Sequence, residues 1–497
     1  MRRLLNSKDR TKHVYLSGKT RHGKSTLLHT LIYQDMRNGE GLCVIDAKGD
    51  LIPSLLHWVP GYRKQDVILL DLDHPIPMDF MACRDQKERT TLVSDIIQIF
   101  KRLDEGWGVR MEALLRYVIH TLLAYGSPTF FDIYRILADE GFRKTIVKSP
   151  QVQSQEVLRN FWATQFDRLG KDASTPIIVS RMADFLLSPA LTVILGTRNA
   201  ELNIDQAMND GKILLVNLHG TTDEAMVYGS LLVSKIQQAI FRRAGKEKGK
   251  PFMLYVDEFQ NFKTSAFEKI LSMAGGLNLG LTLANQYFDQ LDPETRGAIL
   301  NNVSTFFLFR MGTENAAQLK GELRYFPRTP HDGLTIRERN DAIATLKRHL
   351  TLYRNALTQW ERDHKGDPSY AIERIATSEK ELAYHEGIIE DHAPGIASKY
   401  IDQLPNLPVG QCIYHAADGS TTRIKTPAPP PHTSQVGKTS YAQAIKAHTL
   451  AQYGTKRPVD NGTGHPAQVL HTEGNDYHPK AEKPEPQAGP RIPFDES

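Results

Sequence analysis

Short apolar runs alternate with segments of helical spacing through the first part of the chain. Residues 13–18 form an apolar run, residues 25–36 carry apolar side chains three and four positions apart, and an Asn-Gly pair at 38–39 ends that pattern. Further apolar runs follow at 41–45 and 67–72. Because strand, helix and strand alternate in this order, the pattern predicts a parallel sheet with helices packed against it.

A different pattern occupies residues 88–208. Apolar residues recur there at helical spacing in two successive sets: Leu92, Ile96, Ile99 and Leu103, then Leu114, Leu115, Val118, Ile119 and Leu122. Strand-like runs return at 213–218, 252–256, 281–284 and 305–309. We therefore expect one α/β core that is interrupted by an all-α insertion.

Charged residues dominate beyond Gly321, but two more helices are predicted. Their apolar positions are Ile343, Leu346, Leu350, Tyr353, Leu357 and Trp360 in the first, and Ile372, Ile375, Leu382 and Ile389 in the second. Gly366, Asp367 and Pro368 separate the two sets, which indicates an antiparallel helical hairpin. Such a hairpin is either a solvated, minor feature or an arm that binds a partner.

The end of the chain changes character again. Runs at 411–415 and 421–425 predict a short β-hairpin that returns to the core. From residue 428 large apolar residues are few, so burial cannot offset the entropy lost on ordering and a disordered tail is expected. The predicted division is two core parts at 1–87 and 209–330, the insertion at 88–208, the charged hairpin at 335–392, the returning segment at 395–427 and the Pro/Gly-rich tail at 428–497.

The residues after the first apolar run match a phosphate-binding loop. They are Gly18, Lys19, Thr20, Arg21, His22, Gly23, Lys24, Ser25 and Thr26. In such a loop glycines let backbone N–H groups surround phosphates, the lysine contacts the β- and γ-phosphate oxygens, and the serine ligates Mg²⁺. The bare pattern also arises by chance, but here a predicted strand enters the loop and a predicted helix leaves it. We therefore expect ATP and Mg²⁺ to bind here.

A second signal is the apolar run at 252–256, which ends in Asp257 and Glu258. In P-loop ATPases such a pair provides one carboxylate that organises Mg²⁺ and one that polarises water. Acids after a strand are often only helix caps. With a phosphate loop upstream, however, the pair favours nucleotide hydrolysis.

Polar residues also end three other predicted strands. Asn285 and Gln286 follow one, where an amide either senses the γ-phosphate and orients water or forms a turn. Arg310 ends the next, where a guanidinium either neutralises transition-state charge, in this or a neighbouring subunit, or forms a surface ion pair. The charged segment 46–50 lies at the edge where open α/β sheets bind ligands, and a capped loop explains it equally well.

The amino-acid composition indicates the protein class and cellular compartment more clearly than the function. The chain has 497 residues, 40% hydrophobic and 24% charged, as in soluble globular proteins. Cys43, Cys83 and Cys412 lack the spacing of a zinc site or a disulfide framework. A net charge of +4 is compatible with nucleic-acid binding but does not identify it. With no signal peptide or long apolar stretch in the sequence, we expect a cytoplasmic protein with only indirect membrane contact.

Taken in order, the motifs resemble those of the hexameric DNA-pumping ATPases that include the TraG/TraD-type coupling proteins of type IV secretion, FtsK and HerA. The coupling type is the nearest. The segments that carry the resemblance are 18–26, 46–51, 107–112, 257–262, 285–287, 301–312 and 315–317. Together they span roughly residues 10–325, and the returning hairpin belongs to the resemblance as well.

The resemblance implies a RecA-like P-loop NTPase core with an all-α insertion. Carried over by position, Lys24 would bind phosphate, while Ser25 and Asp257 would hold Mg²⁺. Glu258 would activate water, and Gln286 would sense the γ-phosphate. Head-to-tail copies in a ring would place each ATP site at an interface, so an arginine acting from the next subunit is expected.

Three features depart from the family pattern. Coupling proteins usually begin with membrane-spanning helices, whereas here the first predicted core strand starts at residue 13. The relatives often carry a basic residue between the acidic pair and the glutamine, but residues 272–277 read Ser-Met-Ala-Gly-Gly-Leu, so Arg310 is the substitute candidate. The charged hairpin at 335–392 has no place in the family pattern.

The resemblance thus implies an ATP-hydrolysing DNA translocase for conjugative transfer, with DNA bound without sequence preference. Its expected partners are further copies in a homo-oligomeric ring, expected to be a hexamer, together with relaxase and type IV secretion components. The alternatives are a HerA-like repair translocase working with a nuclease, a secretion ATPase that exports protein, and a non-enzymatic, nucleotide-switched scaffold.

Overall fold

The structure is a computed structural model of the 497-residue chain. It describes residue 5 and residues 7–103, 106–170, 174–198, 200–218, 222–243, 251–262, 270–271, 278–323, 336–363, 368–391, 400–417, 420–428 and 438–454. The segment 272–277, the predicted turns at 366–367 and 418–419, and residues 455–497 of the predicted tail lie outside the described residues.

One nine-stranded sheet forms the centre of the described structure, in the order β3-β4-β2-β5-β6-β1-β7-β8-β9. The strands are β1 (Val14–Ser17), β2 (Gly41–Asp46), β3 (Val67–Asp71), β4 (Ile213–Asn217), β5 (Phe252–Asp257), β6 (Leu279–Asn285), β7 (Thr305–Leu308), β8 (Gln411–His415) and β9 (Thr421–Lys425). Neighbours from β3 to β7 pair in parallel, and β7, β8 and β9 pair antiparallel. The predicted α/β fold with a mostly parallel sheet and a returning β-hairpin is therefore confirmed.

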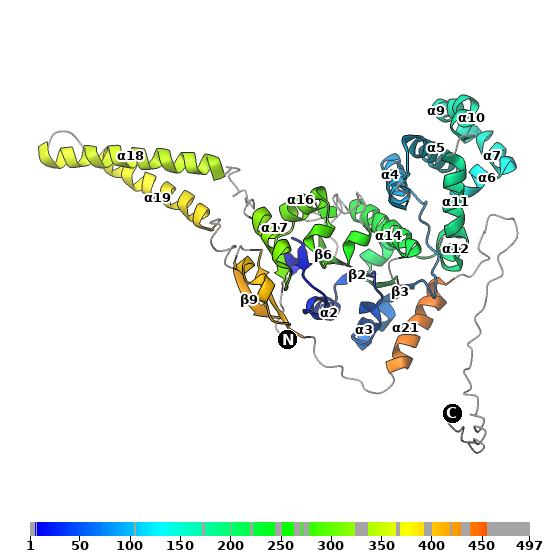
Figure 1. Cartoon of the computed structure of the whole chain (residues 1–497), viewed down its shortest axis with the longest axis horizontal. Helices are drawn as coiled ribbons and strands as arrows, with labels where there is room; N and C mark the ends of the chain where they lie inside the picture. The colour runs from blue at the N-terminus through cyan, green and yellow to red at the C-terminus, as the bar shows by residue number, and fades with distance from the viewer. Residues whose placement is uncertain are drawn as a thin grey trace, which may run out of the picture.

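The central strands are apolar throughout because both faces of the sheet are buried. Along β1, Tyr15 faces one apolar cluster while Val14 and Leu16 face another. Helices α2 (Lys24–Arg37) and α3 (Leu51–Leu56) belong to the cluster of Val14. Helices α4 (Gln86–Leu103) and α14 (Asp223–Arg242) belong to the other. The sheet is thus the middle layer of three, as Figure 1 shows.

As the helical spacing predicted, the described residues between β3 and β4 form helices. After α4 these are α5 (Val109–Tyr125), α6 (Asp132–Ala138), α7 (Glu140–Val147), α8 (Pro150–Gln153), α9 (Glu156–Asn160), α10 (Phe166–Gly170), α11 (Ser174–Leu186), α12 (Pro189–Gly196) and α13 (Ile204–Asn209). Most of them gather to one side of the sheet (Figure 1). Beyond β6, α16 (Pro293–Asn302) and α17 (Thr313–Leu323) flank β7 in sequence.

Within the described residues, no single helix is both long enough and apolar enough to cross a membrane. One pair, Thr175–Leu186 with Pro189–Gly196, passes that test only when its two helices are taken together, and they are bent by 102° at the break.

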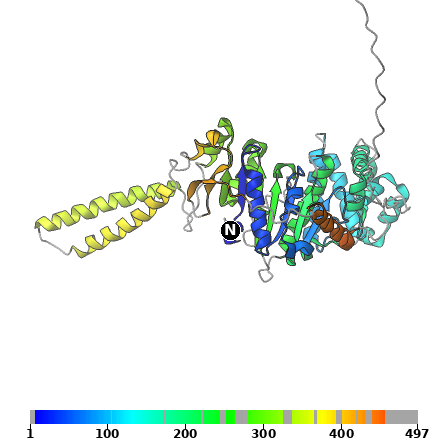
Figure 2. The same cartoon turned by 90° about the horizontal axis from the view of Figure 1, so that it is seen from below.

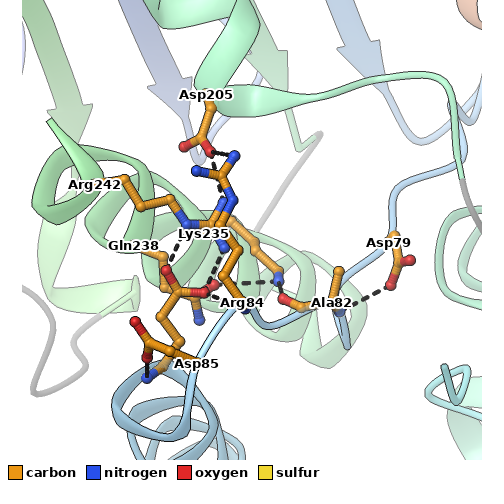
Figure 3. A network of polar contacts seen from close by, with 9 residues as sticks. Asp79, Ala82, Arg84, Asp85, Asp205, Lys235, Gln238 and Arg242 are labelled. Atoms are coloured by element: carbon orange, nitrogen blue, oxygen red, sulfur yellow. Dashed lines mark hydrogen bonds and ion pairs between the residues drawn. The ribbon is translucent and has the colours of Figure 1, made fainter. Parts of the chain in front are cut away.

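A network of charged side chains joins the start of the insertion to the core (Figure 3). Arg242 of α14 donates two hydrogen bonds of 2.5 Å to the carboxylate of Glu88 on α4 and one of 2.7 Å to Asp205 on α13. Arg84 also reaches Asp205, at 2.5 Å. Because Arg242 is mostly buried, with 19% of its side chain exposed, its pairs are less screened by water than surface pairs are.

The predicted helical hairpin is present as α18 (Ile336–Asp363) and α19 (Ser369–Asp391). The two helices run side by side and project away from the sheet in both views (Figures 1 and 2). An ion pair of 2.6 Å joins Arg354 to Glu379 across them, and both side chains are about half exposed. Of the predicted apolar positions, Leu350 of α18 is buried, whereas Ile372 of α19 is 52% exposed.

The expectation of a disordered tail from residue 428 is wrong for part of that segment. Residues Lys438–Tyr453 form a helix, α21. This stretch contains six alanine, leucine and isoleucine residues in a segment with no proline or glycine. Its helical pattern was hidden because the tail as a whole is rich in proline and glycine.

Helix α21 is ordered by its contacts with the free edge of the sheet at β3. Ile445 is fully buried, and the hydroxyl of Thr449 accepts a hydrogen bond of 3.2 Å from the backbone N–H of Leu69. The Tyr441 hydroxyl donates to the backbone carbonyl of Val59 at 3.2 Å. Burial and these hydrogen bonds offset the conformational entropy that this segment loses when it becomes ordered.

Removing the hub of the charged network should weaken the fold measurably. We expect Arg242→Ala to lower the free energy of unfolding by about 2–3 kcal/mol, because Glu88 would lose both hydrogen bonds from its guanidinium partner and Asp205 would be left with the pair to Arg84. Arg354→Ala, which breaks an exposed pair, is the matched control and should cost under about 1 kcal/mol. Urea denaturation followed by circular dichroism measures both, and equal effects would contradict the assigned role of Arg242.

Candidate functional site

The phosphate loop leaves the end of β1 and enters α2, whose first residue is Lys24. Gly18 and Gly23 have backbone φ angles of 146° and 114°, which side-chain-bearing residues rarely adopt. A Cβ atom on Gly18 would lie 2.5 Å from the Cβ of Phe309. The loop therefore has the shape predicted for it, with glycine required where the chain turns and where another segment approaches closely.

Two neighbouring segments hold this loop in place. The backbone N–H of Lys19 donates to the carbonyl of Arg310 at 2.8 Å, and the N–H of Gly410 donates to the carbonyl of His22 at 3.1 Å. Gly410 precedes β8, so the returning β-hairpin contacts the loop directly. A Cβ atom on Gly23 would meet Phe309 and Gly410 at 3.1 and 3.4 Å. The shape of the phosphate loop therefore depends on segments that come long after it in sequence.

Lys24 is the buried cation of the loop. Its ammonium donates a hydrogen bond of 2.7 Å to the backbone carbonyl of Asn285 at the end of β6. Burial lowers the pKa of Lys24, and the nearby carboxylates of Glu258 and Asp257 oppose that effect in part. Ser25 and Thr26, at the start of α2, are exposed. A buried ammonium beside exposed hydroxyls at a helix N-terminus fits a polyphosphate.

Asp257 ends β5 and is paired in register with Asp46 at the end of β2. Burial raises the pKa of Asp257 to about 6, and the neighbouring charge of Glu258 adds to the effect. Among the described residues no group of three or more His, Cys, Asp or Glu side chains is arranged to hold a metal. Mg²⁺ commonly takes only one or two carboxylates and completes its shell with phosphate oxygens and water. The hydroxyl of Ser25 and the carboxylate of Asp257 fit that donor set.

Glu258 has a left-handed backbone, with φ at 49°, and its side chain is buried. Its Oε1 accepts hydrogen bonds from Lys48 Nζ at 2.5 Å and from Gln286 Nε2 at 2.8 Å. Its Oε2 accepts one from Gln260 Nε2 at 2.8 Å. Burial acts to raise the pKa of Glu258, but these three donors outweigh it and hold the pKa below its usual value. Glu258 is thus an ionised carboxylate in the centre of the site.

The two amides after β6 have different surroundings. The Asn285 side chain accepts a hydrogen bond from the Tyr15 hydroxyl at 2.8 Å and donates to the Tyr287 carbonyl at 2.9 Å, so it serves the fold. Gln286 contacts Glu258 and also lies 3.4 Å from the hydroxyl of Thr20 in the phosphate loop. Of the two, Gln286 is therefore the one whose side chain contacts both the loop and the acidic pair.

Arg310 is exposed and lies beside the phosphate loop of its own chain, through the bond of its carbonyl to Lys19. Lys19 and His22 are half-buried, while Thr20 and Arg21 are exposed. The structure thus brings the predicted residues of the loop, the acidic pair and Gln286 to one edge of the sheet, with Arg310 at the margin.

Residues of the charged segment 46–50, for which the sequence allows either a ligand-binding or a capping role, have different partners in the structure. The Asp46 carboxylate accepts four backbone N–H bonds of 2.7–3.1 Å from the turn and the start of α3, as a loop cap does. Lys48 instead reaches across to Glu258.

Gln260 is a further residue of the site that the sequence does not single out. Its place two residues beyond Glu258 was the available signal, but only the positive φ of Glu258 turns its amide back toward that carboxylate.

The order of the strands and the glycine-rich turn define a RecA-like P-loop NTPase core. Strand β6 lies between the phosphate-loop strand β1 and the acidic strand β5. Because β6 is the middle strand, Gln286 at its end lies between the loop and the acidic pair and contacts both. The fold expected from the sequence is therefore confirmed by the chain's own topology.

No protein-family model matches the chain, and no curated protein does. Among solved structures, the plasmid coupling protein TrwB in complex with a non-hydrolysable GTP analogue is similar with a TM-score of 0.47 and 14% identity, over 63% of this chain and 74% of that one. VirB4 of Thermoanaerobacter pseudethanolicus is similar with a TM-score of 0.48 and 12% identity, over 84% of this chain and 90% of that one.

The close approach at Gly18 gives a direct test of the loop. We expect Gly18→Ala to lower the free energy of unfolding by about 2–4 kcal/mol, because the new methyl group would meet Phe309 at an unfavourable backbone angle. Gly297→Ala is the matched control, since Gly297 lies within a helix with open space around it and alanine should be neutral or stabilising there. Urea denaturation of both variants measures the difference, and a stable Gly18→Ala protein would contradict the packing described.

Proposed function

We propose that this chain is an ATPase that hydrolyses ATP with Mg²⁺ at the edge of the sheet formed by the ends of β1, β5 and β6. The observation that carries the proposal is the contact of Gln286 with both Thr20 of the phosphate loop and Glu258 of the acidic pair. These two contacts place the Gln286 amide between the loop and the acidic pair. The buried position of Glu258 supports a role beyond helix capping, since burying a carboxylate is costly unless donors offset it, and here three side chains donate to it.

The roles of the residues follow from their positions. Bound ATP with Mg²⁺ supplies the γ-phosphoryl group that is transferred to water. Lys24 would hold phosphate oxygens, while Ser25 and Asp257 would hold the cation. Glu258 would orient the water and take its proton, and Gln286 would keep that water in line.

We further propose that the chain works as a DNA-moving motor in a homo-oligomeric ring and serves conjugative transfer through a type IV secretion machine. The order of the motifs between residues 18 and 317 supports this assignment. Arg310 supports a ring, because an exposed arginine at the margin of the site is placed where a neighbouring copy could use it. In this proposal the helices of 88–208 form an insertion domain between core parts 1–87 and 209–330, and the 335–392 hairpin is a separate arm.

DNA would be held through its phosphates by basic side chains, without sequence preference. A relaxase and components of the secretion channel are the proposed partners, and contact with the membrane would pass through them.

Glu258→Gln tests the hydrolytic role. We expect turnover to fall by about 10²–10⁴-fold, the range typical of losing a general base, while ATP binding is retained. Lys24→Ala should instead weaken ATP binding itself. A coupled phosphate-release assay measures turnover, and equilibrium binding of a fluorescent ATP analogue measures affinity. Undiminished turnover in Glu258→Gln would contradict the role of Glu258 as general base.

The motor assignment has a separate test. We expect the ATPase rate per chain to rise with protein concentration as shared sites assemble, and to rise again when DNA is added. The DNA effect should weaken as salt increases, because phosphate contacts release counterions. Lys24→Ala is the control for contaminating ATPases. A rate that depends on neither protein concentration nor DNA would contradict the ring and the DNA substrate, while leaving the ATPase assignment intact.

A further inference from the structure

The carboxylate of Glu258 has little capacity left for a water molecule. A carboxylate offers about four acceptor positions, two on each oxygen. Lys48 and Gln286 both donate to Oε1, and Gln260 donates to Oε2. Both positions on Oε1 are filled, so a water held beside Gln286 can reach that oxygen only if one of its two donors leaves.

Lys48 is the strongest of the three donors, because it is charged and the other two are neutral amides. Hydrogen bonds between ionised partners are roughly twice as strong as those between neutral groups. The Glu258 side chain is only 4% exposed, so water screens its side of the pair weakly. The Lys48 side chain is 36% exposed and can therefore leave toward solvent without crossing the core.

The backbone around Lys48 fixes where its side chain starts. Asp46 binds the N–H groups of Lys48 and Gly49 and those of Leu51 and Ile52 at the start of α3. The turn is thereby held at the end of β2, next to the end of β5 that carries Asp257. Only the side chain of Lys48 is left to move, so its contact with Glu258 can be made and broken without rearranging the turn.

We propose that Lys48 is a positioning residue that restrains Glu258, and that hydrolysis requires Glu258 to exchange the ammonium of Lys48 for the attacking water. This inference rests on the proposed ATPase function and adds a control point to it. Because the Lys48 side chain is 36% exposed, water can solvate its ammonium when the pair opens. The ion pair thus keeps the basal rate low, and it is lost when the site is engaged for hydrolysis.

The test is the basal ATPase rate of Lys48→Ala, measured at saturating ATP, together with its affinity for a fluorescent ATP analogue. We expect the rate to rise by about three- to tenfold, because one charge-assisted hydrogen bond no longer has to be broken. The affinity for the analogue should stay unchanged. Lys48→Arg retains a cation at the position and should return the rate to near the wild-type value.

Two controls separate a restraint from a general structural effect. Lys212→Ala breaks a half-buried pair of 3.2 Å with Asp66 that lies before β4 and should leave the basal rate unchanged. Lys48→Ala combined with Glu258→Gln should be inactive, which would show that the faster rate passes through Glu258. Thermal unfolding of each variant establishes that the proteins compared are folded.

The outcomes are distinct. An inactive wild-type chain would overturn the proposed ATPase function itself. An active wild type with an unchanged or lower rate in folded Lys48→Ala would overturn the restraint. A rate that falls together with ATP affinity would also overturn it, because Lys48 would then be a nucleotide ligand. If Lys48→Ala does not fold, Lys48→Gln tests the same point with a neutral side chain of similar reach, and a rate that does not rise overturns the restraint.

Discussion

The packing of the phosphate loop against the strand end next to it sets the geometry of the whole site. Gly18 lies so close to Phe309 that no side chain fits between them, and the adjacent hydrogen bond from Lys19 to Arg310 ties the loop to the end of β7. On the other side, β1 is paired to β6, which carries Gln286 at its end. Loop, amide and acidic pair therefore share one rigid frame, and small shifts of the sheet would move them together.

The carboxyl edge of the sheet concentrates charge in a small, poorly hydrated space. Lys24 and Lys48 provide positive charge, while Asp257 and Glu258 provide negative charge, and the pKa shifts follow from that crowding: burial raises the pKa of Asp257, and hydrogen bonds lower that of Glu258. Neighbouring carboxylates with pKa values displaced in opposite directions are common where two acids have different tasks. The roles proposed above, cation ligand for Asp257 and base for Glu258, are tasks of that kind.

Much of this arrangement could be predicted from the sequence because its signals are local. A phosphate loop has fixed spacing, a buried strand is a continuous apolar run, and parallel strands bring their ends to one edge. Lys48 could not be assigned in this way, because its contact with Glu258 joins residues 210 positions apart and depends on β2 lying next to β5. The contact of Gly410 with the loop also joins residues far apart in sequence, so the sequence does not reveal it. Helix α21 is hidden for a different reason, because the composition of the whole tail averages one short helix with its Pro- and Gly-rich surroundings.

Helix α21 bears on how copies of this chain can meet. A parallel sheet that ends in an uncovered strand offers a row of backbone groups to any other strand, and such edges promote uncontrolled association. Here Thr449 takes the N–H of Leu69, and the helix lies along β3. Extension of the sheet from one copy into the next is therefore blocked at the β3 edge, while β9 forms the opposite edge. The helix thus prevents fibre-like growth from the β3 edge, which lies on the other side of β6 from β1 and its phosphate loop.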